Sequence, residues 1–211
     1  MEKQTTRKFT PYRERVAFKF MNQIIDNALH DCRVVSVGLQ DAQWTPIQKA
    51  MVGIIPIGMS IVCSIRELVR MGYIPSAKIL VRPLIERVAL ADYIAKNDAA
   101  ADDWNNGWSN KNKRLTFAQL LSILENDHKE DWEIYQKFMV DDFNSVIHPD
   151  PKGDETFLSE NENGQPVYWL ETVPSAFALA DNVCAASSMA ATFLASHAKR
   201  AFVYKNNDRR N

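Results

Sequence analysis

The chain has 211 residues, of which 46% are hydrophobic and 24% are charged, an ordinary composition for a globular protein. Its net charge of −1 does not point to a nucleic-acid or membrane protein, and its 7 glycines argue against an all-β fold rich in tight turns. The cysteines lack any paired metal-ligand spacing, so we expect no structural zinc and reduced thiols in a cytoplasmic protein. They are Cys32, Cys63 and Cys184.

The first predicted helix begins at Thr10-Pro11 and runs to about Val37. A hydroxyl at the N-cap followed by proline at the first helical position favours this start. The polar segment before it carries no apolar stretch, so we expect no secretory signal. The apolar positions predicted to face the core are Val16, Phe20, Ile24 and Leu29.

The second predicted helix repeats the start signal at Thr45-Pro46 and runs to about Met71, before Gly72. Pro56 lies inside it and is expected to kink it, because the proline ring displaces a carbonyl and removes a donor. The positions predicted to form its inner stripe are Ile57, Ile61, Ile65 and Leu68.

The uncharged segment 50–65 could be a membrane-spanning helix or a buried core helix. It is shorter than the roughly 18 residues that a membrane-spanning helix needs, and it contains Gly53, Pro56 and Gly58. We therefore interpret it as a buried core helix, with a membrane-associated helix as the alternative, and expect no membrane partner.

The third predicted helix runs from Ile74 to about Lys96 and is apolar almost all round, which is typical of a central helix. Pro83 is a second expected kink. Arg82 and Glu86 lie four residues apart on this helix, and charges on so apolar a helix are expected to be paired. Two alternatives follow: a buried structural ion pair, or a polar pocket inside the bundle.

Shorter helices are predicted over 98–108 and 116–125, followed by a longer one over 129–147. The helix over 98–108 would place two indole rings on one face, those of Trp104 and Trp108. We interpret this pair as part of the core, with a base-stacking platform as the alternative.

The segment 149–173 differs in character from the rest of the chain. An Asn-Gly pair at 163–164 between two apolar runs predicts a small β-hairpin insert near 154–171, for which a long ordered loop is the alternative. A last helix, rich in alanine, is predicted from Pro174 to about Tyr204.

These elements together predict an all-α fold, an up-and-down bundle of about six or seven helices with the hairpin as an insert. We expect one domain over residues 1–211, with frayed tails at 1–9 and 205–211.

Charge is unevenly distributed along the chain. Residues 125–162 include 12 acidic and 3 basic side chains, whereas both ends of the chain are basic. A solvated surface explains this pattern, and the alternative is contact between the acidic and basic faces of two chains in a homodimer.

His148 is the most prominent titratable residue in the sequence. It ends the helix predicted over 129–147, where the helix dipole favours a protonated imidazole, and Asn144 shares its face. The alternatives are a cap bonded to the carbonyls of its own helix and a functional site. Glu125 and His128 have the Glu-x-x-His spacing of di-iron bundles, but a second such motif is missing, so we expect no metal and no cofactor.

Two short motifs carry a resemblance to known proteins. Arg82 to Glu86 forms an Arg-x-x-x-Glu on an apolar helix, and Phe143 to Pro149 forms an aromatic-x-Ser-x-x-His-Pro element at the end of a later helix. In this order, followed by an alanine-rich helix, they resemble a group of uncharacterised all-helical bacterial proteins with a domain of unknown function.

The second element is also similar to the Arg-Asn-x-x-x-His motif of HEPN proteins. That resemblance implies a dimeric helical bundle that acts on RNA or handles nucleotides without metal. His148 and Asn144 match the motif's histidine and asparagine, whereas Phe143 stands at the position of its arginine.

Two functional hypotheses follow from the sequence. In the first, the protein is HEPN-like, acts on or binds RNA or a nucleotide, and uses His148 and Asn144 as tentative catalytic residues; a metal-independent ribonuclease is its enzymatic form. In the second, it is a non-catalytic bundle that binds a protein or a small molecule, with Arg82 and Glu86 in the pocket.

Overall fold

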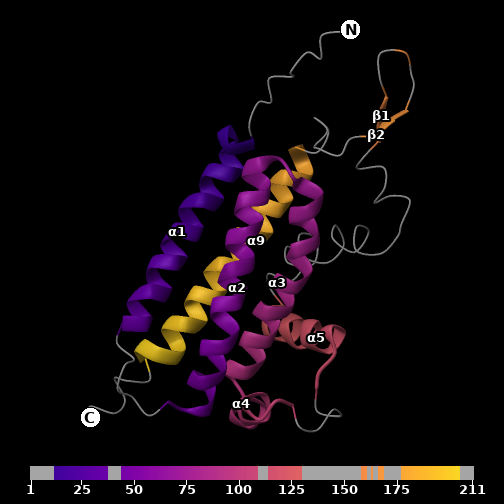
Figure 1. Ribbon diagram of the computed structural model, residues 1–211. Coiled ribbons are helices and arrows are strands. Elements are labelled where there is room, and N and C mark those ends of the chain that lie inside the picture. The colour runs from indigo at the N-terminus through magenta and orange to yellow at the C-terminus, as the bar shows by residue number, and fades with distance from the viewer. Residues whose placement is uncertain are drawn as a thin grey trace.

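The protein forms a bundle of long helices, with shorter helices packed at one end (Figure 1). The computed structural model describes residues 12–37, 44–108, 114–129, 158–160, 163, 166–168 and 177–204. The long helices are α1 (Val16–Val37), α2 (Pro46–Met71), α3 (Ile74–Ala95) and α9 (Phe177–Lys199), and the short ones are α4 (Asp98–Asn105) and α5 (Phe117–Asp127). The predicted all-α class is confirmed, whereas the helix predicted over 129–147 and both expected tails lie outside the described residues.

The long helices run in two directions along the bundle (Figure 1). At one end of α1, Arg15 pairs with Asp181 of α9, and at the other end Asp31 pairs with Lys199 of α9. These two ion pairs show that α1 and α9 run in the same direction, and Figure 1 shows α3 running alongside them in that direction too. Of the long helices, α2 alone runs the opposite way.

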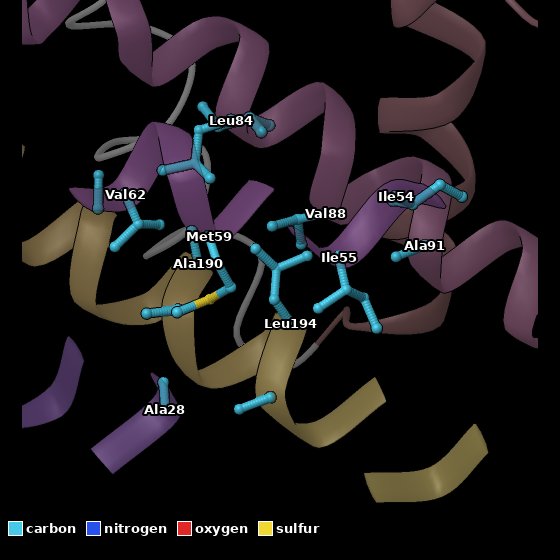
Figure 2. Close-up of a cluster of buried hydrophobic side chains, with 14 of the residues drawn as sticks. Ala28, Ile54, Ile55, Met59, Val62, Leu84, Val88, Ala91, Ala190 and Leu194 are labelled. Carbon is cyan, nitrogen blue, oxygen red and sulfur yellow. The ribbon is translucent and has the colours of Figure 1, made fainter. Parts of the chain in front are cut away.

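The core is formed where α9 packs against α1, α2 and α3. Figure 2 shows side chains of these helices meeting in its centre. Alanines of α9 are buried there and let the neighbouring helices approach closely. At Gly58 of α2 the approach is so tight that an added Cβ would lie 2.7 Å from Cδ1 of Leu194. The buried alanines of α9 are Ala180, Ala186, Ala190, Ala191, Ala195 and Ala198.

Helix caps lie where the sequence places them. Thr45 caps α2 in a capping box with Gln48, and Gly72 ends the helix with a φ of 88°. Thr116 forms the same kind of box with Gln119 at the start of α5. Pro56 and Pro83 lie inside α2 and α3, and neither ends its helix.

The helix faces predicted for α1 and α2 were partly wrong. Val16 and Phe20 are 84% and 58% exposed, and Ile57 of α2 is 48% exposed. Both helices carry apolar residues on more than one face, so spacing alone does not select the face that α9 covers. The buried positions of α1 are instead Phe18, Met21, Ile25 and Ala28.

Two other predictions met different outcomes. The helix predicted over 98–108 ends at Asn105, because Gly107 and Trp108 adopt left-handed conformations. Strands β1 (Leu158–Glu160) and β2 (Pro166–Tyr168) pair antiparallel, with Ser159 opposite Val167. They are only three residues each, and most of the chain around them lies outside the described residues, so the hairpin insert stays a prediction.

Two helical stretches are long and apolar enough to cross a membrane, Pro46–Met71 and Ala178–Phe202. The most apolar part of the first is only 39% buried, and that of the second 56%. Core helices of soluble proteins have the same length and composition, so this pattern is weak evidence for a membrane segment.

Candidate functional site

The structure locates one of the two predicted pairs of site residues. Asn144 and His148 lie outside the described residues. Arg82 and Glu86 both lie on α3, where Arg82 Nε is 3.7 Å from Glu86 Oε1. Their side chains are 31% and 44% exposed, so they do not form the buried ion pair that was one interpretation of the sequence.

Arg82 also packs against an aromatic ring. Its guanidinium carbon lies 5.1 Å from the centre of the Phe117 ring, at the first residue of α5. A guanidinium over a ring face is attracted by the ring quadrupole. Arg82 therefore positions Phe117 and links α5 to α3, while Glu86, one turn further along, remains available on the same side.

Glu86 lines a cleft of about 400 Å³ between α3 and the short helices. Its volume lies within the range of about 300–1,000 Å³ that small-molecule sites usually have. The lining residues with polar groups are Glu86, Arg87, Trp104, Trp108, Arg114 and Thr116, and the apolar ones are Ile61, Pro83, Leu90, Leu115, Phe117 and Leu120.

Two tryptophans form the aromatic part of this cleft. The rings of Trp104 and Trp108 stand edge to face, with centroids 5.9 Å apart and planes at 86°. Trp108 has a φ of 49° and follows Gly107, whose φ is 72°. A bulky residue in the left-handed region is unusual and costs about 1–2 kcal/mol. That conformation brings the indole of Trp108, which follows the end of α4, to the cleft beside Trp104 in the last turn of α4.

The charged groups give the cleft a positive character. Among the described residues, Arg87 and Arg114 line it together with one carboxylate, that of Glu86. Arg114 is exposed and Arg87 is half-buried, so both remain within reach of solvent and of a bound molecule. An anionic group would be attracted here, and a guanidinium offers it paired, directional donors.

A second cluster of charged groups lies deeper, where α3, α5 and α9 meet. Asp92 of α3 is 2% exposed, and its Oδ2 accepts a hydrogen bond from Lys96 Nζ at 2.7 Å. Its Oδ1 faces two imidazoles, with His197 Nε2 of α9 at 3.4 Å and His128 Nε2 at 3.7 Å. Lys96 also donates to Asp127 at the end of α5, at 2.8 Å.

The surroundings of Asp92 favour its ionised form. Burial by itself raises the pKa of this carboxyl, but its contacts with His197 and Lys96 outweigh burial and hold the pKa well below its usual range. Burial likewise lowers the pKa of Lys96, but Asp127 and Asp92 outweigh it and raise that pKa. Asp92 and Lys96 therefore form a charged pair at the end of α3, and their contacts with Asp127 and His197 join α5 and α9 to it.

This buried cluster is built for structure more than for turnover. Asp92 and His197 are each 2% exposed, and neither lines the cleft at Glu86. Within the described ranges, no group of three or more His, Cys, Asp or Glu side chains is arranged to hold a metal ion. Sequence reasoning named His128 but missed the cluster, although an acidic residue on a mostly apolar helix was a usable signal.

Comparison with protein-family models, with curated proteins and with solved structures finds no match to this chain. The resemblance to HEPN proteins and to the bacterial helical group therefore stays a prediction from two motifs.

Proposed function

We propose that the protein binds a planar small molecule with an anionic group, in the cleft between α3, α4 and α5. The observation that carries the proposal is that Trp104, Trp108 and Glu86 line one cleft. The backbone of Trp108 adopts a left-handed conformation there. A strained backbone persists where the surrounding structure holds it, and such positions are concentrated at ligand sites.

The chemistry of the lining suggests which molecule would bind. Aromatic side chains bind planar rings, and stacking on them contributes about 1–3 kcal/mol per ring when measured by substitution. Arg87 and Arg114 would hold an anionic substituent, and Glu86 would accept a hydrogen bond from a ring N–H or a sugar hydroxyl. A nucleotide combines all of these groups, so the nucleotide class is the best match.

Calorimetric titration of the purified protein with AMP and with adenosine tests this proposal. We expect AMP to bind more tightly than adenosine, because only AMP offers an anion to the arginines. Trp104→Leu should weaken AMP binding by about 5-fold or more, since it removes one aromatic face. Trp44→Leu is the matched control, because Trp44 lies outside this cleft.

Arg114→Gln separates the role of charge from that of stacking. Arg114 is exposed and outside the core, so this variant should fold normally. It should reduce the preference for AMP over adenosine and leave adenosine binding unchanged. Failure of both ligands to bind the unaltered protein at millimolar concentration would reject the nucleotide class.

The HEPN-like hypothesis is a second proposal, and it rests on the Asn144–His148 element together with the helix that carries Arg82 and Glu86. In it, a homodimer acts on RNA, with His148 and Asn144 at the site. Incubating an RNA pool with the protein in a chelator, beside His148→Ala, tests it. Cleavage by the unaltered protein and not by the variant would support a metal-independent ribonuclease. Intact RNA with both proteins would argue against the ribonuclease and favour the binding function.

A further inference from the structure

A separate groove runs between α1 and α2, with the end of α9 as its floor. Its volume is about 750 Å³, nearly twice that of the cleft at Glu86. On α2 the lining extends from Met51 to Cys63, about 18 Å along the helix axis. The apolar lining residues are Leu29, Met51, Val52, Ile55, Pro56, Met59, Ala198 and Phe202, together with the thiols Cys32 and Cys63.

The groove exists because α1 packs mainly against α9, while its contact with α2 includes the ion pair between Asp26 and Arg66 at 2.8 Å. Ion pairs from Arg15 to Asp181 and from Asp31 to Lys199 fix both ends of α1 on α9. The apolar face of α2 that α1 leaves uncovered includes Val52, which is 38% exposed. Ala198 on the floor is small, which adds depth between the two walls.

One end of the groove has polar character. Arg33, near the end of α1, and Trp44, just before α2, both line it. The indole Nε1 of Trp44 is buried, and among the described residues it has no hydrogen-bond partner. A buried donor left without an acceptor is destabilising, so a ligand acceptor that reaches Nε1 at this end of the groove would be stabilising.

We propose that this groove binds a single-chain amphiphile, with its alkyl chain along α2 and a carboxylate at Trp44 and Arg33. The long apolar lining fits a flexible hydrocarbon chain, and the polar groups at one end fit one acceptor head. The proposal is independent of the nucleotide cleft, which shares none of its lining residues. It assigns the protein a second ligand of a different chemical class.

The two cysteines in the lining provide a direct readout. Cys32 and Cys63 line the groove, whereas Cys184 is buried near Asp181, away from it. Labelling with N-ethylmaleimide, followed by mass spectrometry of peptides, should therefore report occupancy at Cys63 directly. Palmitate should slow labelling of Cys63 and leave that of Cys184 unchanged. Burial raises the pKa of Cys32, so its labelling is expected to be slow throughout and is the weaker reporter.

Titration with palmitate in the full chain is the main experiment, with three variants. Val52→Trp fills the groove from an exposed position and should weaken binding by 10-fold or more, about 1.4 kcal/mol. Trp44→Phe keeps the ring but removes the donor and should weaken binding by about 5-fold. Ile79→Trp adds the same bulk at an exposed position of α3 outside the groove and should change nothing.

The outcomes are distinct. Saturable binding that Val52→Trp weakens, with protection of Cys63, supports the amphiphile. Binding that no variant changes, or an absence of saturable binding, overturns it. A stable dimer in sedimentation that Val52→Trp disrupts would also overturn it, since a second chain would then cover the groove. Arg114→Gln should leave palmitate binding unchanged, so that failure here and failure of the nucleotide proposal remain distinguishable.

Discussion

Asp92 is a single carboxylate on which three helices depend. It lies on α3, it accepts from Lys96, and it faces His128 and His197 from the other two elements. A buried charge with several partners is strongly destabilising when one member is removed, because the remaining groups are left without compensation. The cluster therefore makes the packing of α5 and α9 on α3 depend on one side chain.

Asp92→Asn should lower the free energy of unfolding by about 1.5–3 kcal/mol, the usual contribution of a hydrogen bond to a charged group. Asparagine keeps the shape but removes the charge opposite Lys96. Urea unfolding measures the loss. Asp127→Asn is the matched control, because Asp127 is 34% exposed and Lys96 would retain Asp92, and it should cost less than about 1 kcal/mol. Equal losses in the two variants would contradict a special role for Asp92.

The low pKa of Asp92 gives the protein a defined dependence on acid. A carboxyl whose folded-state pKa is lowered contributes stability above its unfolded pKa of about 3.9 and loses it as the pH falls towards the folded value. The stability difference between the unaltered protein and Asp92→Asn should therefore shrink as the pH falls below about 4. Unfolding free energies from pH 5 to pH 2 measure it, and a difference independent of pH would refute the assignment.

At the scale of the element, α2 contains two glycines in opposite settings. A Cβ on Gly58 would lie 2.7 Å from Leu194, which is fully buried, whereas a Cβ on Gly53 would meet its nearest atom, Trp104 Nε1, at 3.9 Å. One glycine permits close packing of α2 on α9, and the other has no packing reason to be glycine.

Gly58→Ala and Gly53→Ala should therefore shift stability in opposite directions. Gly58→Ala forces the two helices apart and should cost about 1–3 kcal/mol, the usual range for overpacking. Gly53→Ala should gain up to about 1 kcal/mol, because alanine has the higher helix propensity. Thermal unfolding of both variants compares them directly, and a gain at both positions would show that α9 yields at Leu194.

The two ends of α2 could be predicted from the sequence, whereas the buried faces of α1 and α2 could not. Thr45 and Gly72 determine where α2 begins and ends through local hydrogen bonds and backbone conformation, which neighbouring residues specify. Phe20 and Ile57 were assigned to the core, but they are exposed, because which apolar face is buried depends on distant helices. The same limit explains why the sequence identified Glu86 and the tryptophans without indicating that they line one cleft.

The Asp92 cluster was beyond sequence reasoning for a related reason. Asp92 and His197 are separated by more than a hundred residues, and no spacing rule connects them. Their encounter results from the packing of α3 against α9, two helices that are distant in the sequence. The sequence showed only that Asp92 is a charged residue on a mostly apolar helix.

At the scale of the whole molecule, stability is unevenly distributed. α2, α3 and α9 contribute most of the buried side chains, whereas α5 contributes only Leu120 and Leu124. α5 is attached to the bundle through these two leucines, the Phe117–Arg82 contact and the Asp92 cluster. Regions with few buried apolar contacts open at lower free energy than the core.

Hydrogen exchange followed by mass spectrometry should therefore show α5 exchanging before α2, α3 and α9. In Asp92→Asn, exchange of α5 should become faster still, while α2 should change less. Gly53→Ala is a suitable control, because Gly53 lies on α2, which contributes no residue to the Asp92 cluster. Exchange of α5 together with the core helices would contradict this order of opening.

Gln48 connects the first turn of α2 to the last turn of the described chain. Its Oε1 accepts from the backbone N–H of Thr45 at 2.9 Å, while its Nε2 donates to the carbonyl of Ala201 at 2.9 Å, in the π-helical turn η6 (Arg200–Tyr204). The side-chain amide of Gln48 thus links two segments that are separated by most of the polypeptide. Ala201 follows Gln48 by 153 residues, so during synthesis α2 acquires its full set of hydrogen bonds only after α9 has been made.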